Sequence, residues 1–173
     1  MSDAVHIHWF RQDLRLADNP ALTQAAQAGT LLPIYILDDE SADEFAMGGA
    51  SRWWLHYSLL SLNESLGGNL VIFRGNAALI LQQLTEKFEI GSIHWNRCYE
   101  PWRITRDKAI KQKLTLQNIE VQTYNGSLLW EPWEISKKDG TPYRVFTPYY
   151  RKGCLVSEPP REPLAAPKNI TYS

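Results

Sequence analysis

The sequence predicts a doubly wound α/β fold with a five-stranded parallel sheet and helices on both faces. Short apolar runs alternate, through residue 124, with longer segments that repeat apolar residues at helical spacing. One of these runs, Leu31–Leu37, is apolar throughout, as expected for a strand that is covered on both faces. Strands that alternate with helices imply βαβ units, parallel pairing and right-handed crossovers.

The first three elements follow from local signals. Val5–Phe10 is predicted to be the first strand. Asn19 suits an N-cap and Pro20 suits the first helical position, so a helix is expected from there to about Ala28. Leu31–Leu37 is the second strand.

The later elements follow the same alternation. The second helix begins near Arg52, carries a stripe of four leucines and ends at Gly67-Gly68: Leu55, Leu59, Leu62 and Leu66. The remaining elements are, in chain order, the strand Leu70–Phe73, a helix with the stripe Ala77, Leu81, Leu84 and Phe88, the strand Ser92–Trp95, the helix Pro101–Gln117 and the strand Ile119–Tyr124.

The rest of the chain differs from residues 1–124, which we predict to be the α/β domain. Residues 125–156 are aromatic and turn-rich, and Asp139-Gly140 is a hairpin signal within them. Residues 157–173 contain four prolines and are predicted to begin an extended interdomain linker. We therefore expect a further domain downstream.

Composition narrows the classes of function. The formal net charge is −1, without the basic excess that tight binding to nucleic acid phosphates usually needs. The sequence has no apolar run of membrane-spanning length and no signal-peptide pattern at its start, so a cytoplasmic protein is expected. Cys98 and Cys154 form no metal, redox or disulfide pattern. We expect a monomer that does not associate with membranes.

Ligands of doubly wound sheets bind beyond the carboxyl ends of the strands, at the point where the strand order reverses. The predicted strand ends are Phe10-Arg11, Leu37-Asp38, Phe73-Arg74 and Trp95-Asn96. The Arg11 guanidinium is suited to an anionic or planar ligand. The alternative is an ion-pair network of Arg11 and Arg15 with Asp13 and Asp18 that fixes the turn.

Arg52 follows Met47-Gly48-Gly49 at the start of a helix, a place that favours anions. The alternative is an exposed arginine after a flexible loop. No catalytic constellation and no metal-ligand spacing is present, so three histidines are expected to be satisfied core or edge residues: His6, His8 and His94.

Two groups can be separated among the seven tryptophans. An aromatic-lined pocket or a domain interface would explain so many, and plain core packing is the alternative. We expect Trp54 and Trp95 to pack in the core. Trp130 and Trp133, in the turn-rich segment, are expected to face another domain.

Several motifs, taken in order, resemble the DNA photolyase/cryptochrome family. They are Trp9–Leu16 with Asp18–Leu22, Pro33–Asp38, Arg52 with the leucine stripe, Asn96 with Tyr99–Pro101 and Arg106-Asp107, and Gly140–Pro148. The resemblance implies a Rossmann-like N-terminal domain that can hold a light-harvesting antenna chromophore. FAD and the DNA lesion would bind in a C-terminal helical domain, which is the expected partner of this domain.

For the intact protein the resemblance implies light-driven splitting of cyclobutane pyrimidine dimers in UV-damaged DNA with reduced FAD. This chain alone is expected to fold, but it has no predicted catalytic residue. We expect it to hold no FAD, to bind no DNA and to repair nothing.

The strand-end rule and the resemblance point to the same antenna site, with Phe10, Arg11, Asp38, Arg52, Asn96 and Glu100. A deazaflavin or FMN is expected there rather than methenyltetrahydrofolate. Folate-binding members place Asn and Glu two and three residues after the Glu of their Tyr-Glu pair, where this chain has Trp102 and Arg103. Neither side chain offers an acceptor to a pterin amine.

Two alternatives share the predicted fold. A cryptochrome-type blue-light photoreceptor has the same domain with a signalling output. A free-standing nucleotide-binding α/β module is the other alternative, and the proline-rich end and the Gly140–Pro148 match argue against it.

Overall fold

The computed structural model describes residues 4–173, which divide into two compact units. The α/β unit runs to Gly126 and also includes Leu164–Ser173, while Ser127–Pro163 forms the second unit. The boundaries predicted from composition lay at residues 124 and 156. The main difference is that the end of the chain packs with the α/β unit.

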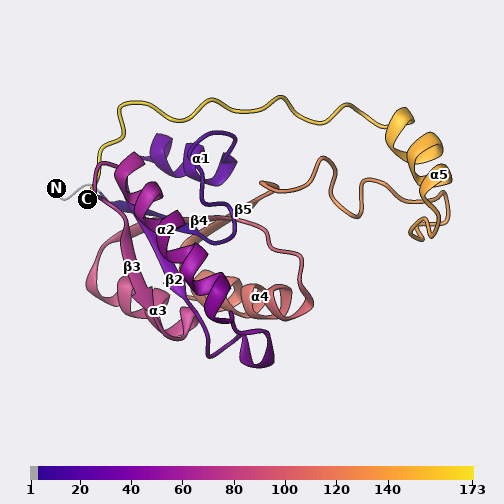
Figure 1. Cartoon of the computed structure of the whole chain (residues 1–173). Helices are drawn as coiled ribbons and strands as arrows, with labels where there is room; N and C mark the ends of the chain where they lie inside the picture. Colours follow the sequence, from indigo (N-terminus) through magenta and orange to yellow (C-terminus); the bar gives the residue numbers. More distant parts are fainter. Residues whose placement is uncertain (1–3) are drawn as a thin grey trace. The chain divides into compact units, whose positions relative to one another are not determined.

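Five strands alternate with four helices in the α/β unit (Figure 1). The elements are β1 (Val5–Phe10), α1 (Pro20–Ala28), β2 (Thr30–Leu37), α2 (Gly49–Ser65), β3 (Val71–Arg74), α3 (Ala77–Lys87), β4 (Ile90–Asn96), α4 (Pro101–Leu116) and β5 (Glu120–Tyr124), with a short 3-10 turn at Asp43–Phe45. Each predicted strand and helix is present, within about one helical turn of its expected bounds. As predicted, the Asn19 side chain caps α1, accepting from the Leu22 N–H at 3.0 Å.

The strand order is β3-β2-β1-β4-β5, and all neighbours pair in parallel. The chain winds outward from β1 to β3, returns to β4 on the other side of β1 and continues to β5. The order therefore reverses between β1 and β4, which is where a doubly wound sheet binds its ligand. The predicted fold class is confirmed.

Two apolar clusters fill the two faces of the sheet, because alternate residues of a strand point to opposite sides. On one face, Ile7, Trp9 and Trp95 pack with buried residues of α3 and α4. On the other face, Phe10 and Tyr35 pack with buried residues of α1 and α2. The leucine stripe predicted for α2 lies in this second cluster: Leu55, Leu59, Leu62 and Leu66.

The predicted linker is in part a docked segment. β3 pairs only with Ile34–Leu37, so the first half of β2 keeps a free edge on that side. Leu31 fills this edge by donating its N–H to the Thr171 carbonyl at 2.8 Å and accepting from the Ser173 N–H at 3.0 Å. Two apolar side chains of the same segment pack against the core: Ile170 and Tyr172. Backbone pairing and apolar burial together order Leu164–Ser173.

In the second unit the predicted hairpin is reduced to a turn. The Gly140 N–H donates to the Lys137 carbonyl at 2.9 Å, but no strand flanks this turn in the described segment 127–163. The Lys137 N–H donates back to the Thr141 carbonyl at 2.9 Å, but the next residue, Pro142, has no N–H to continue a ladder, and isolated two-stranded hairpins are only marginally stable. The unit ends in three short helical segments: α5 (Phe146–Pro148), a π-helical turn (Tyr149–Gly153) and a 3-10 turn (Cys154–Val156).

Candidate functional site

A narrow crevice of about 50 Å³ lies beyond the carboxyl ends of β1 and β2, beside the first turns of α4. Its walls combine aromatic, guanidinium and carboxylate side chains, among them Trp9, Arg11, Asp38, Trp102, Arg103 and Arg106. The crevice is at the reversal of strand order, where the sequence placed the ligand site. α4 supplies three of these side chains, and the sequence prediction did not include them in the site.

A chain of alternating charges organises the crevice. Arg11 forms an ion pair with Asp107, which also accepts from Arg106 Nη2 at 2.9 Å. Arg106 in turn forms an ion pair with Asp38 at 3.3 Å. These side chains are 2–12% exposed, so water screens their charges little and the network holds the crevice wall rigid.

Tryptophan rings alternate with the arginines of this network. The Arg106 guanidinium carbon lies 5.1 Å from the Trp102 ring and 5.0 Å from the Trp9 ring. The Arg11 guanidinium carbon lies 5.0 Å from Trp9 and 5.7 Å from Trp95. These are cation–π distances. The burial of Trp95, which was predicted, is consistent with these contacts, and Trp9 and Trp102 line the crevice.

Some polar atoms around the crevice are buried without a hydrogen-bond partner among residues 4–173: Trp9 Nε1, Arg11 Nε and Glu100 Oε2. Arg103 Nε also makes no hydrogen bond, but it lies 3.5 Å from Glu100 Oε1 in an ion pair. Buried polar groups are nearly always paired, so such atoms need an explanation. A planar heterocycle with carbonyl acceptors and an N–H donor would pair with both the buried N–H donors and the buried carboxylate oxygen. The residues present therefore fit a chromophore of the antenna type.

The Glu100 carboxylate stays ionised at the edge of the crevice. Burial opposes its ionisation, but hydrogen bonds from its own backbone N–H and from Gln12 lower the pKa of Glu100 below its ordinary value. The Gln12 amide nitrogen lies 2.7 Å from Glu100 Oε1. The carboxylate is thus held ready to accept a hydrogen bond through its other oxygen.

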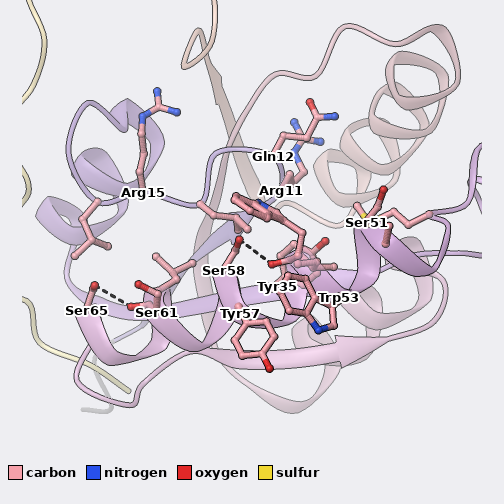
Figure 2. Close-up of a pocket in the computed structure, with 17 residues that line it drawn as sticks. Arg11, Gln12, Arg15, Tyr35, Ser51, Trp53, Tyr57, Ser58, Ser61 and Ser65 are labelled. Atoms are coloured by element: carbon pink, nitrogen blue, oxygen red, sulfur yellow. Dashed lines mark hydrogen bonds between the residues drawn. The ribbon is translucent and has the colours of Figure 1, made fainter.

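A much larger groove of about 1090 Å³ opens between α2 and the loop after β1. Figure 2 shows its floor on α2, with Ser58, Ser61 and Ser65 in a row and Arg15 on the opposite side. The groove and the crevice share four lining residues: Arg11, Gln12, Tyr35 and Met47. Ligand sites usually measure about 300–1,000 Å³. The crevice alone is too small for a flavin or folate ring, but the two hollows together have room for one.

The structure separates the six predicted site residues into two groups. Phe10 is fully buried in the core, so it supports the site and does not line it. Asn96 is also buried, because its amide donates to Asn19 Oδ1 at 2.7 Å and to Asp13. A Cβ on Gly126 would lie 2.4 Å from the Asn96 side chain, so this close packing requires glycine. Asn96 thereby holds the turn after β1 in place.

The other four predicted residues lie at or near the crevice. Arg11 lines both hollows, Asp38 lines the crevice, and Glu100 reaches it through Gln12. Arg52 pairs with Asp39 at 2.9 Å and donates to the Met47 carbonyl at 2.8 Å, so it fixes one wall of the crevice from α2. The role of each residue toward a ligand stays a prediction.

The turn after β1 is fixed by partners that the sequence did not reveal. The expected network joined Arg11 and Arg15 to Asp13 and Asp18. Arg15 does lie 3.8 Å from Asp18, but the carboxylate partner of Arg11 is Asp107 on α4. Asp13 instead accepts from the Arg11 backbone N–H at 2.8 Å.

Two sequence expectations need correction. Trp54 was expected in the core but is 72% exposed and lines the groove. It directly precedes Leu55 of the buried leucine stripe, so its side chain points to a different side of α2.

His8 was expected to have hydrogen-bond partners, but both of its ring nitrogens are buried without one. Burial lowers the pKa of His8 to about 4. His94, by contrast, contacts Ser92 Oγ at 2.6 Å and Tyr124 OH at 3.0 Å.

Residues 4–173 contain no group of three or more metal-ligating side chains arranged around a common point. None of their helices is long and apolar enough to cross a membrane.

Comparison with known proteins decides the family. The profile described as DNA photolyase matches residues 6–168. The chain belongs to the DNA photolyase family. It is 42% identical over 169 residues to a deoxyribodipyrimidine photo-lyase of Agrobacterium fabrum, covering 95% of this chain and 34% of that protein. It is 40% identical over 157 residues to cryptochrome-2 of Arabidopsis thaliana, covering 88% of this chain and 26% of that protein.

Solved photolyases share the fold. A class III photolyase from Agrobacterium tumefaciens superposes with a TM-score of 0.90 at 40% identity, covering this whole chain and 36% of that one. An archaeal photolyase from Sulfolobus tokodaii, described with two FAD molecules and a novel light-harvesting cofactor, gives 0.76 at 26% identity, covering 98% of this chain and 38% of that one. The chain therefore spans about a third of the length of these photolyases.

Proposed function

We propose that this chain is the antenna-binding α/β domain of a DNA photolyase. In the intact protein a further, helical part would hold FAD and the damaged DNA. Reduced FAD bound there would supply the electron that splits a cyclobutane pyrimidine dimer, and the antenna would supply additional absorbed light. The chain's own residues would bind the antenna, orient its ring and exclude water from it.

One observation carries the proposal. At the reversal of strand order, where this class of fold binds ligands, the crevice presents buried N–H donors and a carboxylate oxygen that lack partners. The donors without a partner are Trp9 Nε1 and Arg11 Nε, and the acceptor is Glu100 Oε2 at the edge of the crevice, while Arg103 Nε lies 3.5 Å from Glu100 Oε1 in an ion pair. A heterocycle seated between Trp102 and the loop after β2 would pair with them.

The antenna is proposed to be a deazaflavin or FMN. Trp102 and Arg103 offer only donors to the ligand. The crevice carboxylates of Asp38 and Asp39 already pair with Arg106 and Arg52. A flavin ring, with two carbonyl acceptors, suits such a donor-rich wall better than a pterin amine does. The Sulfolobus photolyase, whose second FAD is described as a light-harvesting cofactor, offers a precedent.

Reconstitution tests this choice. The protein is mixed separately with FMN, a deazaflavin and methenyltetrahydrofolate, and binding is followed by absorbance. We expect saturable binding of at least one flavin-type chromophore, with folate bound more weakly. Tight folate binding with both flavin types rejected would overturn the choice of chromophore and leave the antenna function standing.

Arg52→Ala is expected to weaken chromophore binding by roughly ten- to hundredfold, since a charge-assisted hydrogen bond is worth about 1.5–3 kcal/mol. The fold should be retained, because the Arg52–Asp39 pair is partly exposed and contributes little stability. Fluorescence titration measures the affinity, and circular dichroism checks the fold. Arg74→Ala, at an exposed arginine on β3, is the matched control. Equal affinity in both variants would remove Arg52 from the site.

A photoreceptor function is the second candidate, since cryptochrome-2 is nearly as similar to this chain as the photolyase is. The α/β domain is common to both kinds of protein. A dimer-splitting assay on the intact protein separates them.

A further inference from the structure

The α2 groove differs from the crevice in its electrostatics. The charged side chains among its lining residues are Arg11 and Arg15, and no carboxylate lines it. The crevice, by contrast, balances its arginines with Asp38 and Asp39. Arg11 is buried and already paired with Asp107, so Arg15 is the cation that the groove can offer to an anion.

The Arg15 guanidinium has nitrogens that remain available to a ligand. Its hydrogen bonds to the Asp18 and Gly126 carbonyls, and its ion pair with Asp18, all use Nη2. Nε and Nη1 make no hydrogen bond to any residue between 4 and 173. The side chain is 41% exposed, so these two nitrogens can form the bidentate contact that a phosphate or carboxylate prefers.

Serine hydroxyls line the path between the crevice and Arg15. Figure 2 shows Ser58, Ser61 and Ser65 along α2, with Arg15 over the end near Ser65. The Ser58 hydroxyl donates to the Trp54 carbonyl at 3.0 Å, and the Ser65 hydroxyl donates to the Ser61 carbonyl at 2.9 Å. Their oxygen lone pairs remain to accept hydrogen bonds from a polar ligand chain.

We propose that this groove binds the anionic side chain of the antenna chromophore, with Arg15 holding its terminal phosphate or carboxylate. The ring would lie where the two hollows meet, at Arg11 and Tyr35, and the chain would run along α2. This inference rests on the proposed antenna function. It adds that the site selects chromophores with an anionic tail over the same ring without one.

The test compares ligands that share a ring and differ in the tail. FMN is compared with riboflavin, and a reduced folate with the pterin that lacks its glutamate. We expect the wild-type chain to bind at least one of these two pairs. Within that pair, the ligand with the anionic tail should bind about tenfold more tightly than the ligand without it, as expected for one charge-assisted contact. Arg15→Gln should bring the ratio close to one, while Arg74→Gln, the same change at an exposed site, should preserve it.

A second pair of variants keeps the test independent of any structural role of Arg15. Ser61 is exposed on α2, where glutamate and glutamine are both good helix formers. Ser61→Glu places a carboxylate in the groove and should abolish the preference for the anionic ligand. Ser61→Gln adds the same bulk without charge and should retain it.

The outcomes separate the two proposals. Ligands bound without preference for the anionic tail, or a preference that survives both Arg15→Gln and Ser61→Glu, would overturn the groove assignment and leave the antenna function intact. If no member of either pair binds to the wild-type chain, the antenna function itself fails, and the groove assignment fails with it.

Discussion

The His8→Leu variant is expected to resist acid unfolding better than the wild-type chain. The His8 ring is fully buried beside Phe10, and both its nitrogens lack a partner. Burial lowers its pKa to about 4 from an ordinary value of 6.5. The folded state therefore keeps His8 neutral at a pH where the unfolded chain binds a proton.

This depressed pKa fixes the sign of the pH dependence. Well above pH 6.5 the ring is neutral in both the folded and the unfolded state, so its titration does not change the free energy of unfolding. As the pH falls from 6.5 toward 4, only the unfolded state takes up the proton, so stability declines. The loss should reach roughly 3 kcal/mol at the lower limit, at about 1.36 kcal/mol for each pH unit.

Urea unfolding at several pH values between neutrality and the lower limit measures the effect. His8→Leu, a change of similar volume, should remove the part of the slope that His8 contributes. About half of the slope should remain, because the pKa of His94 is also lowered to about 4 by burial and by His6. His56→Leu, at an exposed histidine on α2, is the control. Identical slopes for wild type and His8→Leu would show that His8 is not the buried neutral group described above.

Asp107→Asn is expected to destabilise the fold by about 3 kcal/mol. Its carboxylate pairs with both Arg11 and Arg106, and the three side chains are only 3–12% exposed. Removing the charge of one partner from a buried pair leaves the other charge uncompensated, which commonly costs about 3–5 kcal/mol. Arg106 would keep Asp38, but Arg11 would lose its carboxylate partner.

Asp39→Asn is the matched comparison, because Asp39 also pairs with an arginine but in a more exposed position. It should cost less than about 1 kcal/mol. The free energies of unfolding at neutral pH measure both. A cost for Asp107→Asn as small as that for Asp39→Asn would mean that the crevice network adds no stability.

The architecture of the α/β unit could be predicted because its signals are local. The apolar run of β2, the leucine stripe of α2 and the Asn19-Pro20 start of α1 each fall within one element. Periodicity and capping report directly on such elements. The position of the proposed site follows from the strand order, since the reversal point is a property of the topology.

What the sequence did not predict depends on contacts between distant residues. The partner of Arg11 is Asp107, on the last helix of the α/β unit. The docking of Leu164–Ser173 depends on an unpaired edge that exists only because β3 is short. Trp54 sits one position from a buried stripe, and its exposure depends on the rotation of α2 against the sheet.

The measurement that tests the central claim most directly is light-driven splitting of thymine dimers by the intact protein that carries this domain. Its wavelength dependence is recorded with and without the bound antenna. We predict repair in light and none in the dark, faster at the wavelengths that the antenna absorbs, with Arg52→Ala lowering only that antenna-dependent part. No dimer splitting in light, with the flavin fully reduced, would contradict the account and favour a photoreceptor.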